Sequence, residues 1–274
     1  MNMKSIILKE VEPVLSAKGY YCRNMAPRDY TFSDINNTRT ISFCLAPHMP
    51  KQLIVRYFVR GKSRFSLELN QFSSEYNGFY NSQAELMLLV KQAIKVTTQI
   101  VLPYLNIMEE VYFEPSEDLY KDLSYNTRKR AEIFSLKYHL PICLQKTNFY
   151  EIDKIIKELR PKDLILQRAV FMANKEILLN IAAYLGEILL LADPKCHWGW
   201  RQLKDVSFRV MHIINDYQQY GLILSNKDTA LAVDPLGRLV LAWNFAELNG
   251  YEISKFPLKN SGHGMIEKHR DLVQ

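Results

Sequence analysis

The stretch that most constrains the fold of this chain covers residues 178–203. Its first part is almost entirely apolar, which is typical of a helix buried in a protein core. Gly186 gives this helix a notch where another element can approach closely, and Glu187 is a single acid inside the apolar run. The helix is expected to stop before Pro194, because proline cannot continue a helix, and a Trp-Gly-Trp segment follows. We therefore predict a core helix that leads into the first strand of a sheet.

The chain has 274 residues, which is longer than a common single domain, so we predict two domains. Apolar residues make up 48% of the chain and charged residues 23%, and this balance excludes a disordered or fibrous protein. The first predicted domain covers residues 1–112 and the second covers 120–256, with the boundary in the acidic segment 114–124. Residues 257–274 are expected to form a loosely ordered tail.

The first predicted domain has one helix, an antiparallel meander and a return helix. Helical spacing of apolar residues predicts a helix over residues 4–18 that ends at Gly19. The return helix covers 82–108, starts with a capping box of Ser82 and Glu85, and is bent or ended by Pro103. Alternation along the fourth strand predicts one buried and one solvated sheet face. The meander is expected to have four or five strands, drawn from the segments rich in β-forming residues at 20–23, 29–33, 38–45, 52–59 and 64–69.

The second predicted domain begins with helices and ends with strands. Helices are expected at 117–138 and 148–159, and the segment 162–191 forms either one long helix or two helices that meet near Asn174. A hairpin-like turn is expected at Asp234-Pro235-Leu236-Gly237. The predicted fold class is therefore α+β, with an antiparallel sheet packed against helices in each domain. The strands of the second sheet are expected at 198–203, 206–214, 229–233 and 239–243.

The sequence contains none of the well-defined catalytic or cofactor-binding motifs. The phosphate-holding patterns GxxxxGK[ST] and GxGxxG are absent, as are the nucleophile elbow GxSxG and the zinc motif HExxH. The cysteines Cys22, Cys44, Cys143 and Cys196 are widely spaced and form no CxxC pair. We therefore assign no catalytic residues, predict no metal and no cofactor, and prefer a protein that is not an enzyme.

Two features of the sequence bear on where the protein acts. Glu10 and Glu12 interrupt the N-terminal apolar run, so this segment is a poor signal peptide. The longest apolar run, residues 177–192, is shorter than the roughly 20 residues that a membrane-spanning helix needs. These observations predict a cytoplasmic protein without a membrane partner.

A basic aromatic segment lies near the end of the meander, where Arg56, Arg60, Lys62 and Arg64 alternate with aromatic and apolar residues. Rings that stack on bases and cations that meet phosphates are the ingredients of a single-stranded nucleic-acid platform. The same composition is also typical of a solvated hairpin in which arginine stems cover aromatic edges. We prefer the solvated hairpin, since the net charge of +6 is modest, and keep polyanion contact as the alternative.

A second candidate surface combines the core helix with the Trp-Gly-Trp strand. Tyr184 and Glu187 could face solvent or a cleft, with the edges of Trp198 and Trp200 beside them, as aromatic residues often do at binding surfaces. The alternative is that Glu187 sits at the edge of the helix and pairs with a cation such as Arg201.

Two parts of the chain resemble uncharacterised bacterial families. Residues 182–189 (AAYLGEIL) followed by Trp198-Gly199-Trp200 resemble domains in which a YLGE-type helix leads into a Trp-x-Trp strand and a small sheet. The N-terminal helix, the Gly19-Tyr20 turn and the Thr31-Phe32 strand are similar to another bacterial family with a helix-plus-sheet layout. Some of these relatives lie beside polymorphic toxins and look like immunity proteins, so the resemblance implies a protein partner and no catalysis.

Together these patterns predict a cytoplasmic bacterial binding protein, an immunity or adaptor protein that acts through protein-protein contacts. The alternative is a nucleic-acid-binding protein or an enzyme that uses the basic aromatic segment or a cleft between the domains. The oligomeric state is left open.

Overall fold

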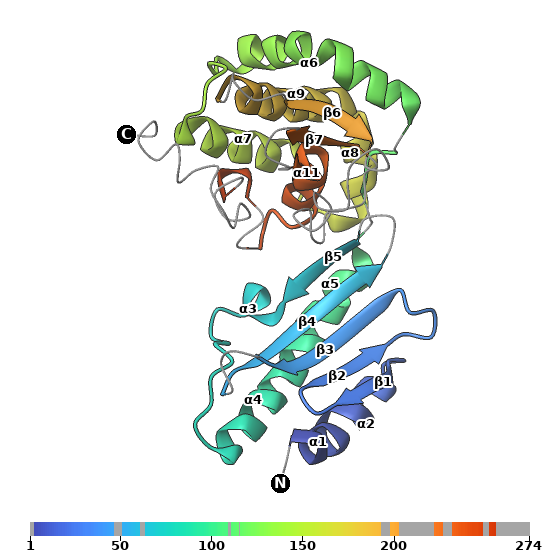
Figure 1. The fold of residues 1–274 in the computed structure, drawn as a ribbon. Coiled ribbons are helices and arrows are strands. Elements are labelled where there is room, and N and C mark those ends of the chain that lie inside the picture. The colour runs from blue at the N-terminus through green and yellow to red at the C-terminus, as the bar shows by residue number, and fades with distance from the viewer. Residues whose placement is uncertain are drawn as a thin grey trace. The chain divides into compact units, whose positions relative to one another are not determined.

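The computed structural model describes residues 3–46, 51–60, 64–108, 111–114, 116–192, 198–202, 222–226, 232–248 and 252–255 (Figure 1). Within these residues the strands form a five-stranded and a three-stranded antiparallel sheet, each accompanied by helices. The predicted α+β class is therefore confirmed. The chain divides into two compact units between Met108 and Glu109, which we call unit 1 and unit 2.

Unit 1 is built as a meander between two helical segments (Figure 1). Its strands follow one another in the order β1-β2-β3-β4-β5, and every neighbouring pair is antiparallel. The elements are α1 (Met3–Ile6), η1 (Ile7–Val11), α2 (Glu12–Ser16), β1 (Tyr21–Ala26), β2 (Asp29–Ser33), β3 (Arg39–Leu45), β4 (Leu53–Arg60), β5 (Arg64–Glu68), α3 (Leu69–Phe72), α4 (Gln83–Val96), η2 (Thr97–Val101) and α5 (Leu102–Ile107).

The two faces of this sheet differ as the alternation in the sequence predicts. Val55 and Tyr57 of β4 are buried, whereas Arg56 and Phe58 between and after them are partly exposed. The hydroxyl of Tyr57 lies 2.6 Å from Oγ1 of Thr97 in η2, which ties the sheet to the return helix. Burial raises the pKa of Tyr57 far above its usual value, so this phenol stays neutral.

The return helix does not end at Pro103 as one version of the prediction had it, but continues to Ile107. The wider turn η2 precedes the proline, and its last bond runs from the N–H of Leu102 to the carbonyl of Thr97, five residues back. A proline ring clashes with the carbonyl four residues before it, and a π-turn relieves that clash. The start of this helix follows the prediction, because Ser82 Oγ accepts a hydrogen bond from Glu85 N.

The helical stretch Gln83–Ile107 is, within the described residues, the one helix long and apolar enough to cross a membrane. In unit 1 this stretch lies along the sheet, and Leu86, Val90 and Ala93 of α4 are buried. The stretch reaches this length because the π-turn η2 lets the helix continue past Pro103, where the sequence suggested a bend or an end.

The described residues of unit 2 form four longer helices and a small sheet of order β6-β7-β8. The predicted helix over 117–138 is confirmed, and it begins at Ser116, whose Oγ accepts from Leu119 N. The two-helix version of the segment 162–191 is confirmed as well, since α8 and α9 meet at Asn174. The elements described are α6 (Glu117–Tyr138), α7 (Lys146–Leu159), η3 (Leu164–Leu166), α8 (Gln167–Ala173), α9 (Lys175–Ala192), β6 (Trp198–Gln202), β7 (Leu222–Asn226), β8 (Ala232–Val233), α11 (Pro235–Asn244) and η5 (Ile253–Lys255).

The predicted strand over 239–243 is wrong, because these residues belong to the helix α11. The expected turn is the start of that helix: Asp234 Oδ1 accepts from Gly237 N at 2.7 Å, and Pro235 occupies the first helical position. The unbroken apolar run 239–243 is also typical of a buried strand, and it masked the helical spacing of apolar residues at 236, 239, 240 and 243. The predicted strand 206–214 and the tail 257–274 lie outside the described residues.

Candidate functional site

The four residues proposed as a recognition surface lie in the core of unit 2. Tyr184 on α9 is fully buried and its hydroxyl donates to the carbonyl of Pro141 at 2.7 Å. Glu187, Trp198 and Trp200 are also buried. Each of these four residues is at most 9% exposed, so together they offer little surface to a partner and pack in the core. The physical reason is that α9 is covered on every side, as expected for a helix that is apolar all round.

The notch at Gly186 serves the close packing that the sequence predicted. A side chain placed there would bring its Cβ to 3.1 Å from Cζ2 of Trp200. The indole of Trp200 therefore lies directly over the glycine, and the Trp-Gly-Trp strand rests on α9 as expected.

Glu187 is paired, but with Arg128 of α6 and not with Arg201. Arg128 Nη1 lies 3.0 Å from Glu187 Oε1, while its Nε donates to Glu132 one turn further along α6. A nearly buried carboxylate needs such a partner, because an unpaired charge in the core is costly. The pairing across 59 positions of sequence could not be inferred from local spacing.

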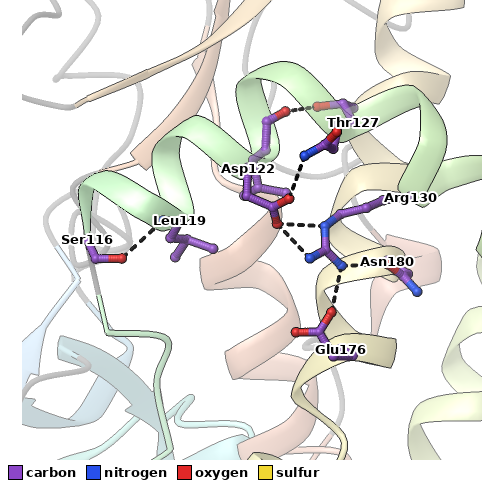
Figure 2. A network of polar contacts seen from close by, with 9 residues as sticks. Ser116, Leu119, Asp122, Thr127, Arg130, Glu176 and Asn180 are labelled. Carbon is purple, nitrogen blue, oxygen red and sulfur yellow. Dashed lines mark hydrogen bonds and ion pairs between the residues drawn. The ribbon is translucent and has the colours of Figure 1, made fainter.

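A larger polar network joins α6 and α9 around Arg130 (Figure 2). Its guanidinium contacts Asp122 on its own helix at 2.6 Å, and Glu176 and Asn180 on α9 at 3.0 and 2.8 Å. The Arg130 side chain is only 15% exposed, whereas that of the nearby Arg128 is 54% exposed. Because a planar guanidinium can meet three partners at once, Arg130 holds the two helices in register.

We expect Arg130→Lys to lower the free energy of unfolding of unit 2 by about 1–2 kcal/mol, since an ammonium cannot replace three directed contacts. The matched control is Arg128→Lys, whose more exposed contacts should be worth less than about 1 kcal/mol. Urea denaturation followed by tryptophan fluorescence measures unit 2 selectively, because all three tryptophans are in that unit. Equal losses in the two variants would contradict the assignment of Arg130 as the stronger of the two arginine links between α6 and α9.

The opposite side of α6 carries large apolar side chains in solvent. Tyr125 is 84% exposed and Leu136 is 76% exposed, and Ile133 beside them is also exposed. Residues 125 and 136 are three helical turns apart and point in nearly the same direction, because 11 residues at 100° each complete about three turns. The spacing of these apolar residues could be read from the sequence, but the many charged residues between them made the helix look like an ordinary solvated one. We call Tyr125, Ile133 and Leu136 the α6 outer face.

Charged side chains of both signs accompany the α6 outer face, because Asp118 and Glu132, seven residues before and after Tyr125, are exposed as well. Lys121 and Lys129 are exposed, and neither has an ion-pair partner among the described residues. Single exposed apolar residues are normal on protein surfaces, whereas a group on one helix face is typical of an interaction site. Tyrosine in such a position is common among residues that dominate binding energy.

In the basic aromatic segment of unit 1, the structure pairs one of the positive charges with an acid. Arg56 Nε donates to Glu68 Oε1 on β5 at 3.1 Å, so its charge is matched by a carboxylate. In the ladder of β4 and β5, residue 60 pairs with residue 64. The side chains of Arg60 and Arg64, and the whole of Lys62, lie outside the described residues, so polyanion contact there stays a prediction.

The outer sheet face around Arg56 is a hydrogen-bonded polar surface. Asp29 Oδ1 accepts from Ser42 Oγ at 2.6 Å and from Thr31 Oγ1 at 3.2 Å. Cys44 lies in the same row as Asp29, and burial raises the pKa of its thiol. A raised pKa keeps the sulfur protonated and weakly nucleophilic, which disfavours Cys44 as a catalytic thiolate.

Two results concern metals and relatives. In the ranges given above for the structure, no group of three His, Cys, Asp or Glu side chains is placed to hold a metal ion. Comparison of the chain with family models, curated proteins and solved structures finds no match. The function is therefore inferred from the chain itself.

Proposed function

We propose that this chain is a non-catalytic binding protein, an adaptor or immunity-type protein, whose unit 2 contacts a partner protein through the α6 outer face. The observation that supports the proposal is the exposure of Tyr125 and Leu136 on one side of a 22-residue helix. Covering water-exposed rings and branched side chains with a partner lowers the free energy, and a rigid helix loses little entropy on binding.

The partner that fits this surface is an amphipathic helix with acidic flanks. A helix laid along α6 would cover apolar residues that extend over roughly 16 Å, given a rise of 1.5 Å per residue. Its carboxylates would meet Lys121 and Lys129 on either side of Tyr125. Charge complementarity of this kind favours the encounter and sets the orientation, while the apolar contacts supply the affinity.

The test uses two matched double variants of the full chain. Tyr125→Ala with Leu136→Ala removes the two most exposed side chains of the α6 outer face, and Tyr150→Ala with Leu88→Ala removes an exposed tyrosine and leucine elsewhere. A partner captured by the wild type should bind the first variant at least about tenfold more weakly and the second unchanged, when each purified pair is measured by calorimetry.

Two outcomes would overturn the proposal. In one, every captured protein binds both double variants with equal affinity. In the other, the first variant changes only the self-association of the chain in analytical ultracentrifugation, so that a second copy occupies the α6 outer face.

A further inference from the structure

A hollow in unit 2, separate from the α6 outer face, surrounds the end of α7. Its volume is about 450 Å³, within the range of roughly 300–1,000 Å³ that small-molecule sites occupy. One wall is the turn that follows α7, and the other is the segment that follows α11. The described lining residues are Lys157, Arg160, Pro161, Lys162, Ala246, Glu247, Leu248 and Glu252.

Arg160 is the feature that distinguishes this hollow from an ordinary surface depression. Its side chain is only 5% exposed, although it carries a full charge. The side-chain amide of the buried Gln167 lies against the guanidinium, and in the amide orientation that satisfies both groups its oxygen accepts from Arg160 Nε at 3.1 Å. Nη2 also points toward the carbonyl of Asn244 at 3.4 Å. These neutral acceptors fix the guanidinium from behind without neutralising it.

A single carboxylate balances Arg160 within the described residues, and it comes from the solvent side. Glu247 Oε1 lies 3.1 Å from Arg160 Nη1, yet the Glu247 side chain is 60% exposed. This carboxylate can leave the guanidinium without disturbing the core, because most of the Glu247 side chain is exposed. The position of Glu247 therefore marks where a carboxylate binds to Arg160.

The surroundings add positive charge at that position. Lys157 and Lys162 line the same hollow, are exposed, and have no ion-pair partner among the described residues. The far wall is anchored, because Asp153 on α7 accepts from the N–H groups of Ile253 and Ser254, directly after Glu252. Once Glu247 has moved away, the charged residues that line the hollow are the cations Lys157, Arg160 and Lys162 and the carboxylate of Glu252.

We propose that this hollow binds a small molecule with at least two carboxylates, one of which replaces Glu247 on Arg160 while another meets Lys157 and Lys162. Nη1 is the guanidinium nitrogen that a ligand carboxylate would reach, because Nε and Nη2 face Gln167 and the carbonyl of Asn244, and the lysines act as point charges. Glu247 is then an internal competitor that occupies the site when the ligand is absent. The inference is independent of the role of the α6 outer face.

The experiment titrates the purified full chain with succinate, citrate and inorganic phosphate at constant ionic strength, using calorimetry. Succinate or citrate should bind, and Glu247→Gln should tighten that binding about three- to tenfold by removing the competitor. Lys157→Ala with Lys162→Ala should weaken it at least about tenfold. The charge-matched control, Lys18→Ala with Lys95→Ala in unit 1, should leave it unchanged.

The lysine and Glu247 variants change exposed side chains, so folding does not limit the test as it would for Arg160. The proposal is overturned if neither dicarboxylate nor tricarboxylate binds, or if both lysine double variants bind equally. Binding of phosphate without the carboxylates would overturn the ligand class, and weaker binding by Glu247→Gln would overturn the role of Glu247 as a competitor.

Discussion

Replacement of Trp243 by alanine is expected to lower the free energy of unfolding of unit 2 by about 3–5 kcal/mol. Trp243 is fully buried on α11, and its ring meets that of Phe171 on α8 edge to face, with ring centroids 5.4 Å apart. Phe171 in turn packs on Phe113, with centroids 5.0 Å apart. Truncation of the indole therefore leaves a cavity where α8 and α11 meet, and the packed neighbours can fill it only in part.

Urea denaturation monitored by fluorescence measures this loss, because Trp198 and Trp200 remain as reporters within unit 2. Ile165→Ala provides the control, since this exposed apolar side chain of the same unit should change stability by less than about 0.5 kcal/mol. A loss below about 1.5 kcal/mol for Trp243→Ala would mean that α11 is not the packed element the structure shows.

The stability of unit 2 is expected to fall as the pH rises from about 4 to about 8, and Asp234→Asn should remove that part of the dependence. Burial raises the pKa of Asp234 from its ordinary 3.8 to about 8, against the opposing influence of the Gly237 N–H and of Arg238. Oδ2 has no hydrogen-bond partner among the described residues, so ionisation in the folded state is unfavourable.

The sign follows from the two states. Below pH 4 the carboxyl is protonated both folded and unfolded, so the stabilising contribution is complete. Between the two pKa values only the unfolded chain releases the proton, and stability is lost until the folded pKa is passed. A shift of this size corresponds to a change on the order of 5 kcal/mol, at about 1.4 kcal/mol for each pKa unit.

The measurement is the urea midpoint of unit 2 at pH 4.5, 6 and 8 for the wild type and two variants. Asp234→Asn keeps an oxygen to cap Gly237 N but cannot ionise, so its midpoint should vary less with pH. Asp234→Ala also removes the titration but loses the cap, and should be less stable than Asp234→Asn by about 1 kcal/mol at every pH. An unchanged slope in Asp234→Asn would show that Asp234 does not titrate in this range.

Capping chemistry and periodicity explain why the sequence predicted much of unit 1 and the helices of unit 2. Ser82 and Ser116 each start a helix through contacts within three residues. Alternation along β4 assigned Val55 and Tyr57 to one face and Arg56 to the other, because a strand reverses its side chains at every residue, and the structure buries the first of these faces. These signals involve residues close together in the sequence, so they can be recognised without knowledge of the rest of the chain.

The candidate surfaces were harder to predict, because exposure depends on what covers a residue. Tyr184 and Glu187 looked like members of a binding face, yet α6 and the Pro141 turn cover them. Tyr125 and Leu136 looked like parts of an ordinary charged helix, yet they remain in solvent. The burial of Arg160 could not be predicted from neighbouring residues, since it contacts the distant Glu247 and the carbonyl of Asn244 at the end of α11.

By itself, the sequence determined the α+β class, the buried helix α9 with its notch at Gly186, and the strand with Trp200 that fills the notch. Each of these follows from residue spacing within one element or from two elements adjacent in the chain. Tertiary structure alone decided that Glu187 pairs with Arg128 and that Tyr184 is covered while Tyr125 stays in solvent. The reason is that these outcomes depend on which parts of the chain cover a residue and on charges brought together from distant positions, which no local pattern encodes.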